Sequence, residues 1–136
     1  MCAVLGIKTR ILRPGRLVPV WRAAGQAELV WAGFARKESL GWWKKRDAEL
    51  VDIPAHRFAE RSDKDGRLRW DDMPEGCVVR GLIEPNEGRP LLKVVTRASS
   101  EEEVLRFEHA RMPLTEPPLF NAQVIEPAPE AQAELF

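Results

Sequence analysis

Proline and glycine divide this sequence into short segments, which limits the length of any helix or strand. The chain has 11 Pro and 9 Gly among 136 residues, and neither residue is favoured inside a long helix. The runs between these breaks are rich in Val, Leu, Trp and Phe, which favour strands. Strand candidates outnumber helix candidates, so the sequence predicts an α+β fold dominated by β-structure.

Local signals predict four strands and one short helix. The strands are Leu17–Val20, Glu28–Phe34, Cys77–Ile83 and Leu91–Thr96. Gly25-Gln26 separates the first two, which are predicted to form a hairpin or two neighbouring strands, and a hairpin-like loop, residues 84–90, separates the last two. The helix is predicted to begin at a serine cap, Ser99-Ser100, followed by three acidic residues, and it must end before Pro113.

Composition changes at Leu114. From there to residue 136 the chain holds Pro and Glu but no Lys or Arg, so it cannot build a core of its own. The sequence therefore predicts a globular domain over residues 1–113 and an extended acidic tail over 114–136. Residues 1–60 carry 11 basic and 6 acidic side chains. A basic half can meet a polyanion, although a mixed solvated surface stays an alternative.

Cellular location follows from what the sequence lacks. No apolar run approaches the roughly 18 residues that a membrane helix needs, and the first ten residues lack the pattern of a signal peptide. Cys2 and Cys77 do not make a disulfide framework. We expect a monomer in a reducing, cytoplasmic setting, with no membrane contact.

Cys2 is the candidate nucleophile. Removal of Met1 would leave Cys2 with a thiol and an α-amine on adjacent carbons, with reference pKa values of about 8.5 and 8. Such a pair can capture an aldehyde as a Schiff base and then as a thiazolidine ring. Cys77 has no α-amine and lies in an apolar run, so it is predicted to be a buried structural thiol. That Cys2 is an incidental small residue stays an alternative.

Seven short motifs follow one another along the chain: Met1-Cys2, Arg13-Pro14-Gly15, Trp31-Ala32-Gly33-Phe34, Gly41-Trp42-Trp43, Ala55-His56-Arg57, Cys77–Glu84 and His109-Ala110-Arg111-Met112-Pro113. Their order resembles the SOS response-associated peptidase (SRAP) family. The resemblance implies a compact single domain with a strongly bent antiparallel sheet and few short helices. It also implies recognition of abasic sites in single-stranded DNA, and with it association with the nucleoid of a bacterial or phage-infected cell. Two departures stand out, since Ala3-Val4 replaces the family's Gly-Arg and Ala55 replaces its catalytic Asn.

The resemblance also implies roles for individual residues. The ring-opened sugar aldehyde would be crosslinked to Cys2, with His109 as general acid and base. A carboxylate near the α-amine would accept its proton, and Glu84 is the first candidate, with Glu60 second. The structural alternatives are a helix-terminal role for His109 and a solvated turn position for Glu84.

No cofactor or metal is expected. A zinc site would have to draw on Cys2, Cys77, His56 and His109. No pair among them has the short spacing of structural zinc ligands.

DNA is expected to bind an aromatic and basic surface. Trp42 and Trp43 precede Lys44-Lys45-Arg46, and in a strand their side chains would point to opposite faces, leaving one exposed for base stacking. Burial of both stays an alternative. Further phosphate contacts are predicted from four arginines: Arg13, Arg16, Arg57 and Arg111.

The last residues suggest a second partner. Gln132, Leu135 and Phe136 resemble the short peptide with which bacterial proteins dock on the replicative sliding clamp, a mode suited to an extended tail. An ordinary terminus stays an alternative.

Two other functions remain beside covalent capture of abasic sites. One is binding of single-stranded DNA or a replication partner by the same fold without covalent chemistry. The other is a thiol autopeptidase, which a Cys–His pair allows.

Overall fold

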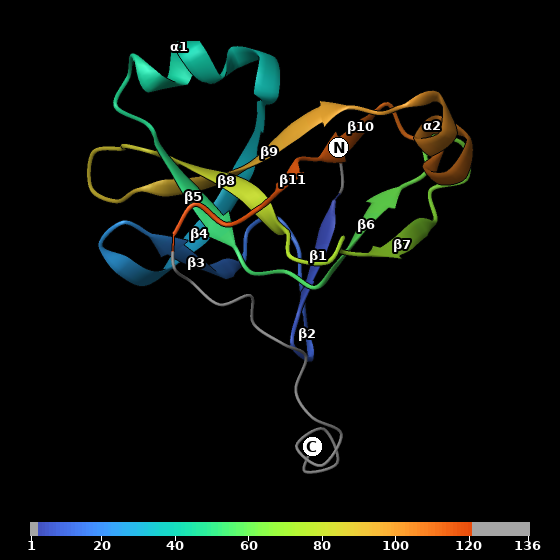
Figure 1. The fold of residues 1–136 in the computed structure, drawn as a ribbon, viewed down its shortest axis with the longest axis horizontal. Coiled ribbons are helices and arrows are strands. Elements are labelled where there is room, and N and C mark those ends of the chain that lie inside the picture. Colours follow the sequence, from blue (N-terminus) through green and yellow to red (C-terminus); the bar gives the residue numbers. More distant parts are fainter. Residues whose placement is uncertain (1–2, 121–136) are drawn as a thin grey trace.

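The structure is a computed structural model that describes residues 3–120 (Figure 1). The strands within this range are β1 (Val4–Ile7), β2 (Arg10–Leu12), β3 (Leu17–Arg22), β4 (Gly25–Arg36), β5 (Glu49–Ile53), β6 (Arg57–Arg61), β7 (Leu68–Asp72), β8 (Val78–Glu84), β9 (Leu91–Ala98), β10 (Arg111–Pro113) and β11 (Thr115–Glu116). The helices are a 3-10 turn, η1 (Lys37–Ser39), α1 (Leu40–Lys44) and α2 (Glu101–Phe107). The predicted α+β class, dominated by strands, is confirmed.

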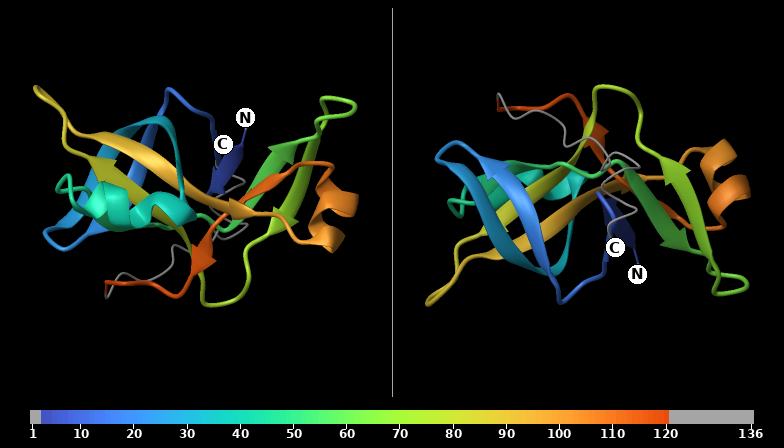
Figure 2. Two further views of the ribbon diagram at one scale, coloured as in Figure 1. Left: turned by 90° about the horizontal axis from the view of Figure 1, so that it is seen from above. Right: turned by 90° about the horizontal axis from the view of Figure 1, so that it is seen from below.

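The strands form two sheets. The larger has the order β10-β9-β4-β3-β5-β8-β11, and an additional pairing between β8 and β9 closes its five central strands into a ring. The smaller has the order β2-β1-β6-β7. Figure 2 shows the closed sheet on one side of the molecule and β6, β7 and α2 on the other. Closure leaves the central strands without free edges.

One pairing in the larger sheet is parallel, where the sequence predicted an antiparallel sheet. β4 runs parallel to β9, with Trp31 beside Leu92 and Arg36 beside Thr96. A parallel pair needs a long connection, and here η1, α1 and β5 to β8 supply it. The register shifts between Trp31 and Gly33, and Gly33 has φ 141°, which only glycine adopts readily.

Both predicted hairpins and the predicted helix are confirmed. β3 pairs with β4 across Gly25, and β8 pairs with β9. At the start of α2, the Ser100 side chain accepts a hydrogen bond from the backbone N–H of Glu103, and the Glu103 carboxylate accepts from the backbone N–H of Ser100. This capping box satisfies two backbone donors that the first turn leaves unpaired.

Trp42 and Trp43 lie in the helix α1 and not in a strand. Trp43 is half-buried and packs against a small cluster that includes Leu82 and Val95, whereas Trp42 is 51% exposed. A tryptophan has no strong helix preference, so packing against the sheet decides the conformation here.

The two sheets share one hydrophobic core. Its buried side chains include Leu5 of β1, Trp31 of β4, Ile53 of β5 and Phe107 of α2. Every residue of β1 is buried, because β1 is an inner strand between β2 and β6 and its Leu5 and Ile7 side chains belong to the core. No helix within residues 3–120 is long and apolar enough to cross a bilayer.

A buried ion pair joins β5 to β8 where the ring is weakest. β3 and β5 share a single paired position, Trp21 with Asp52. Asp52 contacts Arg80, and both side chains are almost completely buried. Arg80 also donates to the carbonyl oxygen of Val51 at 3.0 Å and to Glu116 at 3.0 Å. The pair therefore has the additional hydrogen bonds that a buried charge requires.

The same carboxylate holds the segment after residue 113. The backbone N–H groups of Leu119 and Phe120 donate to Asp52 at 3.0 and 3.1 Å, and Leu114 is buried. Residues 114–120 thus pack on the domain, seven residues beyond the predicted boundary. The rest of the predicted tail lies outside the described residues.

Removing one partner of this pair should destabilise the fold strongly. Arg80→Met leaves Asp52 buried without its cation, so we expect the free energy of unfolding to fall by about 3–5 kcal/mol, measured by urea denaturation. Glu49→Gln breaks the half-exposed pair between Arg22 and Glu49 and serves as the control, with an expected loss below about 1 kcal/mol. Equal losses in the two variants would contradict this role for the buried pair.

Candidate functional site

The structure brings Glu60 and His109 together. Glu60 lies in β6 with a fully buried side chain, and His109 follows α2 with 6% of its surface exposed. Glu60 Oε2 is 3.5 Å from His109 Nε2. Neither carboxyl oxygen of Glu60 has a hydrogen-bond partner within residues 3–120. A buried acid without a close donor beside an imidazole is typical of a proton-transfer site.

Burial changes the protonation of Glu60. Loss of hydration raises the pKa of Glu60 from 4.5 to about 8, and the nearby Asp63 carboxylate adds to the rise. An isolated carboxylate is costly to bury, so the carboxyl group keeps its proton instead. At pH 7 Glu60 is mostly protonated and can donate a proton.

The loop around His109 is held at both ends. Before it, Glu108 ends α2 with φ 52°, and its carboxylate accepts a hydrogen bond from the hydroxyl of Ser62 at 2.7 Å. Its carbonyl oxygen accepts from the backbone N–H of Asp63 at 2.8 Å. At His109 itself, the carbonyl oxygen accepts from the Ser99 hydroxyl at 2.9 Å. The bonds from Ser62 and Asp63 connect the loop to the turn after β6, the strand that contains Glu60. The bond from Ser99 connects it to the segment before α2.

The imidazole of His109 has two distinct nitrogens. Nδ1 lies 2.7 Å from the carbonyl oxygen of Arg111. Nδ1 also lies 3.1 Å from the backbone nitrogen of Arg111, whose N–H donates to it when the ring proton is on Nε2. In the other tautomer, with the proton on Nδ1, the ring donates to the carbonyl oxygen of Arg111, and Nε2 is an acceptor that faces protonated Glu60. A cavity of about 310 Å³ opens beside the ring, with Val104 and Leu105 on its apolar side. The pair is therefore buried but lies next to a space that a ligand can occupy.

The start of β1 lies beside Glu60. β1 pairs with β6 in antiparallel register, Val4 beside Ala59 and Leu5 beside Phe58. One further step of this register places Ala3, itself buried, beside Glu60. Cys2 lies outside the described residues.

Glu84, the first carboxylate candidate, lies at a different end of the sheet. Glu84 pairs with Leu91 at the start of β9, whereas Ala98, at the other end of β9, pairs with Arg111. Seven strand residues separate these ends, which corresponds to about 23 Å. Glu84 faces Lys93 at 3.9 Å. The second candidate, Glu60, is the carboxylate placed at His109.

Arg111 is occupied by contacts within the domain. Its guanidinium donates to both carboxylate oxygens of Glu38, at 2.7 and 3.1 Å, and to the carbonyl oxygen of Thr96 at 2.9 Å. The hydrogen bonds from Arg111 lower the pKa of Glu38 to about 2. Arg111 therefore fixes η1, and with it α1, to β9 and β10.

Arg57 and Trp70 form a stacked pair on the small sheet. The guanidinium carbon of Arg57 lies 4.6 Å from the centre of the Trp70 ring, a cation–π contact. The Arg57 side chain crosses Gly6, where an added Cβ would come within 2.6 Å of its Cγ. Arg57 is half-buried and borders a small cavity with Asp71 and Arg106.

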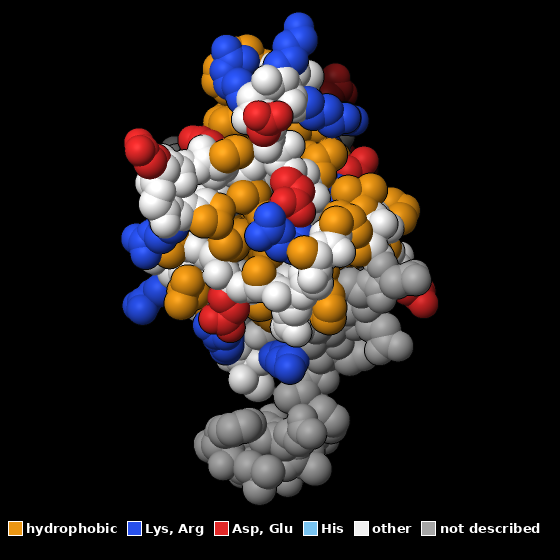
Figure 3. Space-filling view, turned by 90° about the vertical axis from the view of Figure 1, so that its left-hand side faces the viewer, with side chains coloured by type: hydrophobic (Ala, Val, Ile, Leu, Met, Phe, Trp, Pro, Cys, Tyr) orange, Lys and Arg blue, Asp and Glu red, His pale blue; other side chains and the backbone are white. Residues whose placement is uncertain are grey.

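The aromatic and basic residues of α1 form an exposed surface at one end of the molecule. Figure 3 shows Lys and Arg side chains around hydrophobic surface at this end. Lys44, Lys45 and Arg46 are exposed. Arg46 stacks over the Trp42 ring at 3.6 Å, and Trp42 contacts Trp43 edge to face. The predicted DNA surface thus has one exposed tryptophan with cations beside it.

The remaining predicted residues are placed as follows. Arg13 and Arg16 are exposed in the loop between β2 and β3. Ala55 is fully buried in the core. Cys77, predicted to be buried, is half-buried just before β8 and lines a cavity with His56. Gln132, Leu135 and Phe136 lie outside the described residues. Across residues 3–120, no three His, Cys, Asp or Glu side chains lie together in a way that could hold a metal ion.

Ser62, Ser99 and Glu108 are site residues that the sequence reasoning missed. They orient His109 and the turn after Glu60 through the hydrogen bonds described above. Their spacing in the sequence carries no signal, because the contacts join residues that are 10 and 46 positions apart.

Comparison with protein-family models gives no match to this sequence. Comparisons with curated proteins and with solved structures also give none.

Glu60 should make stability depend on pH. The unfolded chain releases this proton above about pH 4.5 and the folded chain only near pH 8, so stability is lost as pH rises through that window. Glu60→Gln removes this loss. We expect the variant to match the parent near pH 4.5 and to exceed it by up to about 5 kcal/mol at pH 9, at about 1.4 kcal/mol per pKa unit.

Thermal or urea unfolding between pH 4.5 and 9 measures this difference. Glu75→Gln, at an exposed position, is the control and should leave the profile unchanged. A parallel profile for Glu60→Gln and the parent protein would contradict a protonated Glu60.

Proposed function

We propose that this protein recognises abasic sites in single-stranded DNA and captures the sugar aldehyde covalently through Cys2. The observation that carries the proposal is the buried pair of Glu60 and His109, located where β1 begins. Ala3 lies beside Glu60 by the register of β1 and β6, and Cys2 precedes Ala3 in the sequence. The order of sequence motifs and the chemistry of Cys2 support the same function.

The chemistry requires proton transfers that this pair can supply. The α-amine of Cys2 adds to the aldehyde carbon, and the resulting hydroxyl leaves as water when it receives a proton, giving an iminium. The thiolate then adds to the iminium carbon and closes the thiazolidine ring. Protonated Glu60 is the proton donor for the departing water, and His109 Nε2 removes the proton from the thiol and passes it to Glu60. No oxidant or reductant is needed.

The surroundings of the pair support an aldehyde substrate. Burial keeps bulk water away from the acid and base groups, Glu60 and His109. The cavity beside His109 has Val104 and Leu105, both exposed, as apolar walls. In its ring-opened form, a deoxyribose without its base offers a free aldehyde beside an apolar methylene group, and these match such a space.

Ala55 supports a second candidate function. The family's catalytic Asn would fall at this position, and here the side chain is a methyl group inside the core. Without that amide, the second candidate is binding of single-stranded DNA without efficient crosslinking. Arg111, which is held by Glu38 and Thr96, adds to the case, because a phosphate would have to displace its carboxylate.

A denaturing gel separates the two candidates. The full chain is incubated with a single-stranded oligonucleotide carrying one abasic site, beside the Cys2→Ser variant. We expect a shifted band with the parent protein that is absent with Cys2→Ser. No band, despite removal of Met1 shown by mass spectrometry, would overturn covalent capture and leave the binding function.

The roles of Glu60 and His109 are tested by the rate of the same reaction. We expect Glu60→Gln and His109→Gln to slow crosslinking by about 10²–10⁴-fold, the usual contribution of a positioned acid or base. Glu84→Gln is the matched control, since Glu84 lies away from His109, and it should react at the parent rate. A slow Glu84→Gln variant with an unaffected Glu60→Gln variant would reverse the assignment.

The two tryptophans of α1 should separate binding from stability. Trp42→Ala is expected to weaken binding to an undamaged single strand by about 1–3 kcal/mol, the worth of one stacked base, with little loss of stability. Trp43→Ala should instead lower the melting temperature, because Trp43 packs on the sheet. Fluorescence anisotropy and thermal unfolding measure the two effects. Unchanged affinity in Trp42→Ala would remove α1 from the DNA-binding surface.

Docking of Gln132, Leu135 and Phe136 on a sliding clamp stays a prediction from the sequence.

A further inference from the structure

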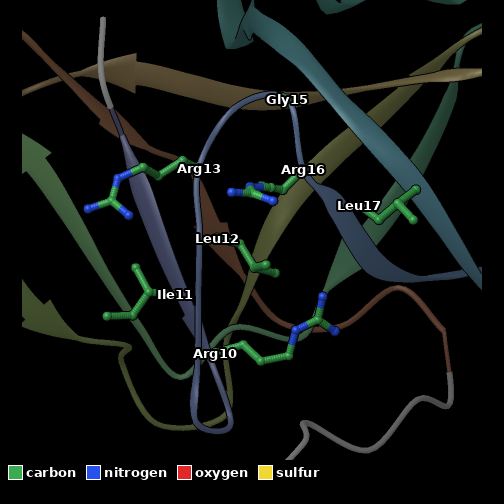
Figure 4. A pocket seen from close by; sticks show the side chains of 7 residues that line it. All are labelled: Arg10, Ile11, Leu12, Arg13, Gly15, Arg16 and Leu17. Carbon is green, nitrogen blue, oxygen red and sulfur yellow. The ribbon is translucent and has the colours of Figure 1, made fainter.

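Three arginines line a groove that the site described above does not use. The loop from β2 to β3 encloses a cavity of about 590 Å³, lined by Arg10, Ile11, Leu12, Arg13, Gly15, Arg16 and Leu17. Figure 4 shows Arg13 and Arg16 extending to the same side, toward β1, whereas Arg10, at the far end of the loop, extends in the opposite direction. The arginines recur at every third position of the sequence.

The groove lies next to the candidate site, across β1 from Glu60. β1 pairs with β2 on one edge, Leu5 beside Leu12, and with β6 on the other. One further step of the first register places Arg13 beside Val4. The arginine loop and Glu60 therefore flank the start of β1 from opposite sides.

The charges in this groove are not neutralised within the described part of the chain. Arg22, Arg80, Arg97 and Arg111 each have a carboxylate partner. No ion pair joins Arg10, Arg13 or Arg16 to any of residues 3–120, and all three are exposed. Three like charges on one short loop repel one another, which costs stability unless an anion binds.

The loop backbone is attached to β4 by two hydrogen bonds. The backbone N–H of Gly15 donates to the carbonyl oxygen of Trp31 at 2.7 Å. The backbone N–H of Trp31 donates to the carbonyl oxygen of Arg16 at 2.9 Å. Gly15 has φ 95°, a conformation that favours glycine. These bonds attach the loop to β4, whose Trp31 is completely buried.

Two aliphatic side chains complete the surface. Ile11 and Leu17 are 46% and 48% exposed, and both line the groove. Apolar groups between cations suit a chain of phosphates separated by sugars, because the sugar carbons can cover them while the phosphates meet the arginines.

We propose that the groove of Arg10, Arg13 and Arg16 binds the phosphate backbone of the DNA strand on the β2 side of the candidate site. The inference rests on the proposed function for its ligand, since it takes DNA to be the partner. It replaces Arg111, which Glu38 already occupies, as a main source of phosphate contacts.

Salt dependence of binding tests the groove. The full chain and an Arg10→Gln, Arg13→Gln, Arg16→Gln triple variant are titrated with an undamaged 20-nucleotide oligothymidine by fluorescence anisotropy, from 50 to 300 mM salt. Each lost phosphate contact lowers the slope of log K against log salt by about 0.7 for single strands. We expect the triple variant to lose about 2 in slope and at least tenfold in affinity at 50 mM salt.

A matched triple variant controls for net charge. Lys37, Arg67 and Arg89 are exposed and lie on separate elements, so their joint replacement by Gln removes the same charge without removing a groove. We expect a much smaller loss of slope and affinity in this variant. Equal losses in the two triple variants, or no binding by the parent protein at 50 mM salt, would overturn the inference.

Failure of the groove and failure of covalent capture give different results. One result is that the parent chain forms no crosslink to the abasic oligonucleotide, while the groove variant still shows a smaller slope of log K against log salt. This result would support phosphate binding by the groove and contradict covalent capture. The other result is that crosslinking proceeds and the salt slope is unchanged in the groove variant. This result would support covalent capture and contradict phosphate binding by the groove.

Discussion

The buried contact between Asp52 and Arg80 is the interaction on which the larger sheet depends. It lies where the ring is weakest, since β3 and β5 pair at one position only. Arg80 reaches the carbonyl oxygen of Val51 and the carboxylate of Glu116, while Asp52 receives the N–H groups of Leu119 and Phe120. A hydrophobic pair could pack between β5 and β8 equally well. It could not accept the hydrogen bonds from the backbone of Leu119 and Phe120. The ion pair therefore joins three parts of the chain at once.

The candidate site combines two physical requirements that usually conflict. A general acid must hold its proton at neutral pH, which favours burial, and it must reach a substrate, which favours exposure. Glu60 meets the first through its complete burial in β6. The cavity beside His109 and the adjacent start of β1 meet the second. As a consequence, the free energy of unfolding above neutral pH is lower with Glu60 than it would be with a glutamine at this position.

Local features of this structure could be predicted from the sequence, and non-local ones could not. The hairpin across Gly25 and the capped start of α2 depend on neighbouring residues, and both were predicted. The parallel pairing of β4 with β9 depends on strands far apart in sequence. The helix at Trp42 and Trp43 forms because Trp43 packs on the sheet and Arg111 holds Glu38. His109 was a candidate from its motif, but its partner could not be chosen, because register alone decides that Glu60 and not Glu84 lies beside it.

The parallel ladder between β4 and β9 also has a consequence for how fast the chain folds. Its paired residues, such as Trp31 and Leu92, are about 60 residues apart, and the ring cannot close until they meet. Closing such a long loop costs conformational entropy before any contact repays it, and folds dominated by distant pairings reach the native state in milliseconds to seconds rather than microseconds. During that time β9 lacks its partner and exposes a strand edge made of Leu92, Val94 and Val95. Dilute refolding conditions would therefore favour the native ring over association between unfinished chains.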